Sequence, residues 1–292
     1  MTPRALLPGV TGAVALVVFG LGARAAAAQD VLRAIEQTGI VRLAVRPDVE
    51  PFSHLDERSG RYEGYSVDLC RAVVRHLGAA LERDLRVEPV EVTALNRFAA
   101  LREGQADLLC EATTVTVERP ISENVDFSMM TFVTGGTFLY REGTLEKGQA
   151  GTGKIGAVTG TTASDAMRAQ NASASGGGPG EPQVYFRDYD QAAEALAAGR
   201  IDLLLGDRLV LERLLKAQDG LGEDVALSER FLSYEPYALA LPAGARELRY
   251  HVDRTLADLY RSGEIGKLVL RHFSIAEVPR DLATMFRLNA LP

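Results

Sequence analysis

The sequence predicts an α/β fold in two lobes of similar construction, and three observations support this prediction. Helix-like and strand-like segments alternate along the chain, which is typical of a sheet with mainly parallel pairing. The alternation stops at a polar, glycine-containing segment, Arg141 to Gly153, and then restarts. In addition, LREGQADLLC (Leu101 to Cys110) and LAAGRIDLLL (Leu196 to Leu205) share the pattern Leu-x-x-Gly-x-x-Asp-Leu-Leu. Each copy has the pattern of a helix end, a glycine stop and a buried strand.

The N-terminus is predicted to be a secretory signal peptide, residues 1–28, and not part of the fold. Arg4 precedes an apolar segment from about Val10 to Leu21, and Ala25 to Ala28 supply the small residues of a cleavage site. The alternative, a retained membrane anchor, needs about 20 apolar residues, and this segment is shorter. The mature chain is therefore expected to be exported.

The composition of the exported chain limits its partners. Loss of Arg4 and Arg24 with the signal peptide leaves 30 basic residues against 39 acidic ones, a net charge of about −9. An acidic surface argues against nucleic acid as a partner. The two cysteines, Cys70 and Cys110, would meet an oxidising compartment, where a pair tends to be bridged. Two buried thiols remain the alternative.

The elements of the first lobe are delimited mainly by glycine, proline and hydroxyl residues. In the longest helix Leu69, Val73 and Leu77 form an apolar stripe, with Ser66 expected as the N-cap and Gly78 as the stop. The expected order is a helix over Val31 to Thr38, a strand over Ile40 to Val45, a turn-rich hairpin over Pro51 to Glu63, a helix over Tyr65 to Gly78, a strand over Val87 to Val92, a helix from Thr93 to Gly104 and a strand over Ala106 to Cys110.

The second lobe is expected between two apolar, β-prone segments, Phe132 to Tyr140 and Ser233 to Gly244, which cross between the lobes. Its elements are a strand over Lys154 to Val158, a turn over Thr159 to Thr162, a helix from about Ser164, a surface loop over Ser173 to Pro182, a strand over Gln183 to Phe186, a helix over Asp190 to Gly199 and a strand over Arg200 to Asp207. After the second crossing, helices over Tyr250 to Arg261 and Ile265 to Phe273 complete the first lobe.

This organisation predicts a division of the chain into two lobes and a tail. Residues 29–134 and 238–276 are assigned to lobe one, residues 135–237 to lobe two, and residues 277–292 to a C-terminal tail with no assigned element.

Polar side chains follow the predicted strands at their carboxyl ends, where open α/β sheets bind ligands. The first lobe contributes three arginines and a hydroxyl, and the second contributes hydroxyls, a tyrosine and an acid: Arg46, Arg97, Thr114 and Arg119 from the first, and Thr161, Thr162, Tyr189 and Asp207 from the second. An α-amino acid needs a forked cation and hydroxyl or amide donors for its carboxylate, and a buried carboxylate for its ammonium. We therefore predict an amino-acid site with no metal or other cofactor.

Simpler structural roles remain open for four of these residues. Arg46 and Arg97 could be surface arginines, Asp207 could only cap the following helix, and Tyr189 could only pack in the core.

Eight short motifs follow one another in the order, and near the spacing, of a known family. They are PF (Pro51, Phe52), GYSVDLC, NR, DLLC-x-x-TT-x-T-x-ER, VDFS, GTT, EPYAL and LYRSGEIGKL, and they span about Val31 to Phe273. Together they resemble the extracellular solute-binding proteins, family 3, of bacterial amino-acid ABC importers, and within these the glutamate/aspartate-binding branch. The resemblance implies a type II periplasmic-binding-protein fold, two α/β lobes joined by a two-crossing hinge that close on the ligand. It also implies a monomer in the periplasm that delivers its amino acid to a membrane permease.

The resemblance assigns roles to the site residues. It implies that Arg119 holds the α-carboxylate with help from Thr114 and the Gly-Thr-Thr turn of Thr161 and Thr162, and that Asp207 takes the α-ammonium.

For the ligand side chain, the resemblance implies that Arg46 and Arg97 receive a carboxylate. The chain departs from the branch at Ala94 and Ala112, where serines are expected, and at Tyr189, where a histidine is expected. Each lost donor can leave a partner unpaired, at about 1–3 kcal/mol. We expect an acidic or otherwise anionic amino acid as the ligand.

Two other functions are alternatives to a binding protein. An enzyme similar to the cyclohexadienyl dehydratases would need a general acid or base in the cleft, and the candidates Glu111 and Asp188 belong to no recognisable catalytic motif. A receptor sensor module would need a transmembrane or signalling segment, and none follows the signal peptide. The prediction is therefore a binding protein and not an enzyme.

Overall fold

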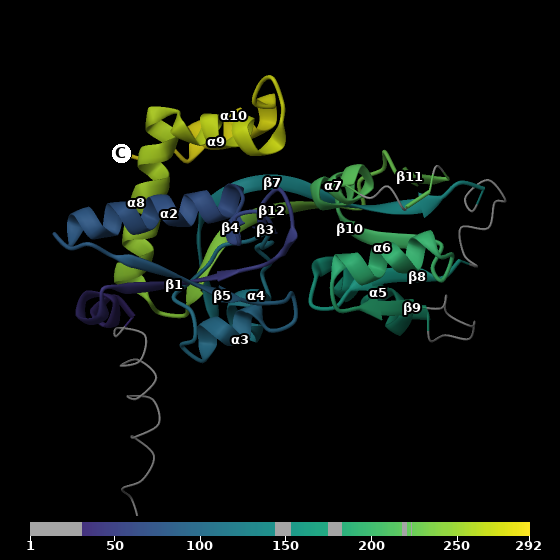
Figure 1. Cartoon of the computed structure of the whole chain (residues 1–292), viewed down its shortest axis with the longest axis horizontal. Coiled ribbons are helices and arrows are strands. Elements are labelled where there is room, and N and C mark those ends of the chain that lie inside the picture. Colours follow the sequence, from purple (N-terminus) through teal and green to yellow (C-terminus); the bar gives the residue numbers. More distant parts are fainter. Residues whose placement is uncertain (1–30, 144–152, 175–182, 218–220, 223) are drawn as a thin grey trace, which may run out of the picture.

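Two long strands connect the halves of the molecule. The computed structural model describes residues 31–143, 153–174, 183–217, 221–222 and 224–292. Within them β7 (Val125–Arg141) and β12 (Ser233–Pro242) pair antiparallel and run from one half of the molecule into the other (Figure 1). They lie in the middle of a sheet with the order β5-β1-β6-β12-β7-β10-β8-β9, with β11 (Val225–Leu227) paired to β7. The predicted signal peptide and most of the predicted Ser173 to Pro182 loop lie outside the described residues.

The first half of the sheet is parallel, as the alternation of helices and strands predicts. Here β1 (Ile40–Val45) lies between β5 (Arg86–Glu91) and β6 (Leu108–Leu109) and pairs with both in parallel. The other elements of this half are a helix over residues 31–38, a small sheet of β2 (Asp48–Val49), β3 (Ser53–Asp56) and β4 (Arg61–Glu63), and the helices α2 (Tyr65–Ala80), α3 (Arg97–Arg102), α4 (Arg119–Ser122), α8 (Arg246–Ser262), α9 (Glu264–Phe273) and α10 (Arg280–Leu288).

The second half repeats the parallel arrangement on the other side of the long strands. In it β8 (Ile155–Val158) pairs in parallel with β9 (Gln183–Phe186) and β10 (Leu203–Asp207), and β10 is antiparallel to β7. Three helices pack on these strands: α5 (Thr162–Ala174), α6 (Tyr189–Ala197) and α7 (Arg208–Ala217). The carboxyl ends of the parallel strands of both halves therefore face the space between the halves.

A disulfide fixes the strand end that leads into the site. Cys70 in α2 is bonded to Cys110, the residue after β6, and this resolves the two alternatives in favour of the bridged pair. The predicted stripe of α2, Leu69, Val73 and Leu77, is buried in the core of the first half. The bridge ties the chain just before Glu111 to this buried helix.

The boundaries of α2 correct two predictions. Ser66 is not the N-cap, because the helix already begins at Tyr65 and its N-cap is Gly64, without a side-chain hydrogen bond. Gly78 does not end the helix, which continues to Ala80. Its role is space: a Cβ at Gly78 would lie 2.9 Å from the carbonyl oxygen of Arg83, so the returning chain could not approach as closely.

Two other segments differ from prediction. The helix expected from Thr93 begins at Arg97, because Thr93 and Asn96 form a turn in which Asn96 Oδ1 accepts from the Thr93 amide at 2.7 Å. The tail without an assigned element contains α10, whose buried Phe286 stacks on Tyr260 of α8 at 5.5 Å between ring centroids. An apolar face on a short terminal helix is enough to hold it against α8.

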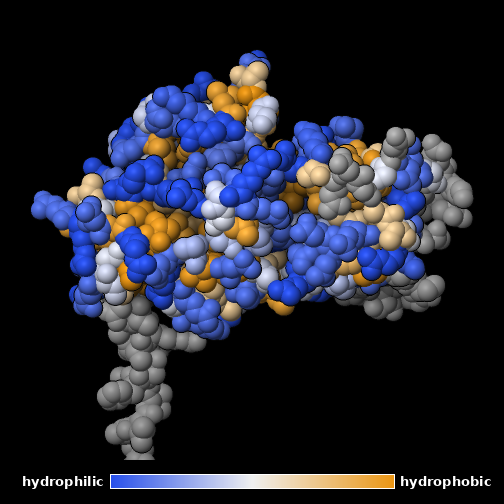
Figure 2. Space-filling model, in the orientation of Figure 1, coloured by the Kyte–Doolittle hydropathy of each residue, from blue (hydrophilic) through white to orange (hydrophobic). Residues whose placement is uncertain are grey.

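The visible surface is mainly hydrophilic, with smaller apolar groups (Figure 2). Figure 2 shows hydrophilic side chains over most of one face of both halves, with apolar side chains in smaller groups between them. Among the described residues, no helix has the length and apolar character needed to cross a bilayer.

Candidate functional site

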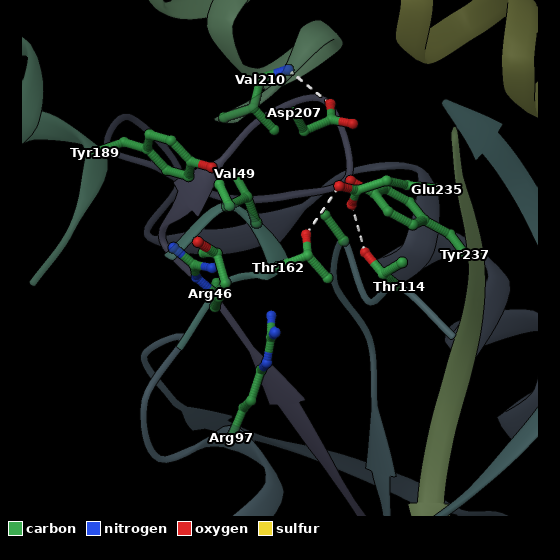
Figure 3. Close-up of a pocket in the computed structure, with 13 residues that line it drawn as sticks. Arg46, Val49, Arg97, Thr114, Thr162, Tyr189, Asp207, Val210, Glu235 and Tyr237 are labelled. Carbon is green, nitrogen blue, oxygen red and sulfur yellow. Dashed lines mark hydrogen bonds between the residues drawn. The ribbon is translucent and has the colours of Figure 1, made fainter. Parts of the chain in front are cut away.

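A pocket lies between the two halves of the sheet, at the carboxyl ends of β1, β6, β8 and β10 (Figure 3). The enclosed space in it is small, about 30 Å³, which is room for about one or two water molecules. Seven of the eight predicted site residues line it. The lining residues are Arg46, Val49, Arg97, Ala112, Thr114, Thr161, Thr162, Ala163, Tyr189, Asp207, Val210, Glu235 and Tyr237.

The two arginines predicted to read a ligand side chain are buried and already paired. Asp48 accepts two hydrogen bonds from the fork of Arg46, at 2.9 Å and 2.6 Å, and Glu111 Oε2 lies 3.8 Å from Arg46 Nη1. Both oxygens of Glu111 accept from Arg97 Nη1, at 2.9 Å and 3.0 Å. Burial lowers the pKa of Arg46, but the carboxylates of Asp48 and Glu111 outweigh burial and raise it above its ordinary value. These arginines are therefore not the surface residues of the simpler alternative.

Arg119 behaves differently from the other two arginines. It is buried, but no carboxylate lies within 4.0 Å of its guanidinium among the described residues. Burial first, and then the positive charge of Arg97, lower the pKa of Arg119 to about 10. It is the one predicted site residue that does not line the pocket: its Nη1 donates to the carbonyl oxygen of Thr114 at 2.6 Å, so it stands directly behind a lining residue.

The hydroxyls of Thr114 and Thr162 donate to the same acid, Glu235, which was not among the predicted site residues. Glu235 on β12 accepts from Thr114 Oγ1 at 2.6 Å through one oxygen and from Thr162 Oγ1 at 2.8 Å through the other (Figure 3). Ser233 Oγ also donates to Glu235, at 3.2 Å. The hydroxyls predicted to donate to a ligand carboxylate therefore donate to a carboxylate of the chain itself.

Asp207 both caps a helix and faces the pocket. Its Oδ1 accepts from the amides of Leu209 and Val210 at the start of α7, at 2.9 Å and 3.1 Å. Its Oδ2 is buried and makes no well-formed hydrogen bond among the described residues, although the hydroxyls of Thr134 and Tyr237 lie close enough to lower the pKa of Asp207. Burial, followed by the negative charge of Glu235, raises the pKa of Asp207 to about 6. One oxygen thus performs the alternative capping role, and the other is open to a donor from a ligand.

Tyr189 and Thr161 occupy the pocket wall in supporting positions. Tyr189 lies 6.0 Å from Arg46 Cζ, measured to the ring centroid, and burial raises the pKa of its hydroxyl. Thr161 uses its hydroxyl locally: it donates to the Val158 carbonyl at 2.7 Å and accepts from the Ser164 amide at 3.2 Å, at the start of α5.

The two halves touch each other around the pocket. Gly160, with φ +84°, lies so close to the first half that a Cβ there would be 2.5 Å from the carbonyl oxygen of Ala94. Its own carbonyl accepts from Arg97 Nη2 at 3.1 Å. Glycine in the Gly-Thr-Thr turn is therefore needed for the close approach of the halves as well as for the turn.

Sequence reasoning missed most of the acids of this site. Asp48 lies in the two-residue strand β2, Glu235 lies in a strand that the sequence predicts only as a crossing between the lobes, and the sequence presents Glu111 only as a catalytic candidate. One signal was available in the sequence. Glu235 directly precedes the apolar run Pro236 to Leu241, and a charged residue is rare in a buried strand unless it is paired or functional.

Comparison with known proteins identifies the relatives of this architecture. The sequence model of the bacterial extracellular solute-binding proteins, family 3, matches residues 41–275. The chain is 28% identical over 262 residues to the L-glutamate/L-aspartate-binding protein of Pseudomonas aeruginosa, which covers 88% of this chain and 84% of that protein. It is 26% identical over 243 residues to the ABC transporter glutamine-binding protein GlnH of Bacillus subtilis, covering 82% and 83% of the two chains.

Solved structures show the same fold. The ancestral amino acid-binding protein AncCDT-1, a precursor of cyclohexadienyl dehydratase, is similar with a TM-score of 0.69 and 25% identity. The match covers 83% of this chain and 99% of that chain.

Proposed function

Because the chain belongs to the bacterial extracellular solute-binding proteins, family 3, we propose that it is the ligand-binding component of an amino-acid ABC importer. It has the predicted fold, a type II periplasmic-binding-protein fold of two α/β lobes. In this role it binds one α-amino acid between the lobes, as a monomer in the periplasm, and presents it to a membrane permease.

The observation that carries the proposal is a pair of complementary unmet charges. Arg119 is a buried cation without an ion-pair partner among the described residues. Within the same residues, Asp207 is a buried acid with no cationic partner, and only the hydroxyls of Thr134 and Tyr237 lie near its Oδ2. A zwitterion bound at Thr114 meets both needs, because its carboxylate lies in front of the Arg119 guanidinium and compensates it, and its ammonium donates to the Asp207 carboxylate. Leaving either group unpaired in a closed pocket is unfavourable, so the ligand stabilises the closed form.

Binding without turnover is the proposed activity. A general acid or base must be free to exchange a proton with the substrate. Glu111, the leading candidate, is held by Arg97 and Arg46, and Asp188 accepts from the Gln191 amide as the N-cap of α6. Turnover of prephenate or arogenate by the pure protein would contradict this part of the proposal.

The side chain of the ligand is a finer question. The relatives include proteins named for glutamate and aspartate and for glutamine, so they do not select one class. The acidic ligand predicted from Arg46 and Arg97 stays a prediction, and the pairing of both arginines with acids of the protein favours a different class of side chain.

A thermal-shift panel of amino acids, dicarboxylic acids and sugars tests the proposed function. A ligand at 100 times its Kd raises the free energy of unfolding by about 2.7 kcal/mol. At least one amino acid should raise the Tm strongly, dicarboxylates and sugars should not, and small-angle scattering should show compaction on binding. A panel without any amino-acid response would refute the proposal.

A further inference from the structure

The charged groups around the pocket are not balanced. Three arginines, Arg46, Arg97 and Arg119, stand among four carboxylates, which are Asp48, Glu111, Asp207 and Glu235. All seven side chains are at most about 7% exposed, so solvent does little to screen them.

Asp48 and Glu111 neutralise two of the three arginines, Arg46 and Arg97. Each guanidinium has a carboxylate of the chain within hydrogen-bond distance. The second donor nitrogen of Arg97 points to the Gly160 carbonyl, and the Arg97 Nε is buried without a hydrogen-bond partner among the described residues. A second ligand carboxylate at this wall would be repelled by Asp48 and Glu111, which already accept hydrogen bonds from both arginines. The arginine wall is therefore largely neutralised and disfavours an acidic side chain.

The opposite wall has an excess of negative charge. Neither Asp207 nor Glu235 has a cationic side chain within 4.0 Å among the described residues, and Glu235 is satisfied only by hydroxyl donors. Once a ligand carboxylate compensates Arg119 and a ligand ammonium compensates Asp207, one uncompensated carboxylate is left, that of Glu235. Figure 3 shows Glu235 on the pocket side opposite Arg46 and Arg97.

Resting on the proposed function, we propose that the ligand is an α-amino acid with a cationic side chain, in which the second positive charge compensates Glu235. Asp48 and Glu111 act as the residues that exclude glutamate and aspartate. An α-amino acid of the lysine, ornithine or arginine type brings two cations and one carboxylate, the complement of the unmet charges in the wall.

Calorimetric titration of the unmodified protein, dialysed out of denaturant to remove retained ligand, tests the proposal. The titrants are L-lysine, L-ornithine, L-arginine, L-glutamine, L-glutamate and L-aspartate. At least one cationic amino acid should bind at least 10-fold more tightly than glutamine and both acidic ones. Tightest binding of glutamate, aspartate or glutamine would overturn this inference and keep the proposed function. No binding of any amino acid would overturn both.

Variants locate the charge selection. Glu235→Gln should reduce the ratio of cationic to acidic affinity at least 10-fold, and Asp48→Asn should reduce it by raising the affinity for glutamate. Glu194→Gln, on the exposed side of α6, removes the same charge away from the pocket and is the matched control. If the control and Glu235→Gln change the ratio equally, the net charge of the protein and not the pocket sets the preference, and the inference fails.

Discussion

The two walls of the pocket carry charges of opposite sign and use them differently. On the arginine wall, Arg46 and Arg97 are each paired with an acid of the same half, Asp48 or Glu111. On the opposite wall, the acids have only hydroxyl and amide donors. Counting arginines predicts an acceptor for acidic ligands, whereas counting unpaired charges predicts the reverse. The charge of the ligand that a pocket favours is therefore set by which of its charged residues lack a partner within the protein, and not by residue type alone.

The strongest test of the arginine wall is to remove its shared acid. Glu111→Gln keeps the shape but leaves Arg97 buried without an anion, which should lower the free energy of unfolding by about 3–5 kcal/mol. Arg97→Met in the same chain should recover much of this loss, because no uncompensated charge then remains. Urea unfolding without ligand measures both. If Glu111→Gln alone lowers the free energy of unfolding by less than about 1 kcal/mol, Glu111 does not neutralise Arg97.

Asp207, on the wall opposite the arginines, should make the free energy of unfolding depend on pH. Because the pKa of Asp207 is raised to about 6 from 3.8, the folded state holds this proton more tightly than the unfolded state. Its contribution to stability is therefore present at low pH and is lost as pH rises from about 4 through 6. Relative to Asp207→Asn, the ligand-free protein should lose about 2–3 kcal/mol of stability between pH 4 and pH 7.

The same group should give ligand affinity the opposite pH dependence. An ammonium prefers the ionised acid, so affinity should fall as pH drops below about 6. Unfolding and titration over this pH range measure the two effects. A stability difference from Asp207→Asn that is constant with pH would contradict the raised pKa.

Arg119 is the exception on its own side of the pocket, and its loss should affect binding more than folding. Arg119→Ala removes the unpaired cation without stranding an acid, so amino-acid affinity should fall about 100-fold, equal to about 2.7 kcal/mol. Arg102→Ala is the control, since Arg102 is a partly exposed arginine on α3 whose partner is Glu123. Titration calorimetry compares the two. Equal affinities in the Arg119→Ala and control proteins would remove Arg119 from the site.

Periodicity and strand-end rules predicted much of this molecule because those signals are local. The alternation of elements located the parallel strands, and the carboxyl-end rule brought Arg46, Thr114 and Asp207 to one pocket. Side-chain partners are not local: Thr114 meets Glu235 from 121 residues away. A hydroxyl at a strand end predicts a donor, but only packing decides whether its acceptor is a ligand or the protein.

The smallest effect is expected where the halves meet at an exposed edge. Arg213 on α7 forms an ion pair with Glu50, and their side chains are 43% and 36% exposed. An exposed pair is worth about 0–1 kcal/mol, because solvent and salt screen it. Arg213→Ala should therefore change amino-acid affinity by less than about 5-fold, and less at high salt. A change as large as that of Arg119→Ala would show that closure depends on the rim, and the difference between the two buried walls would then no longer account for selectivity.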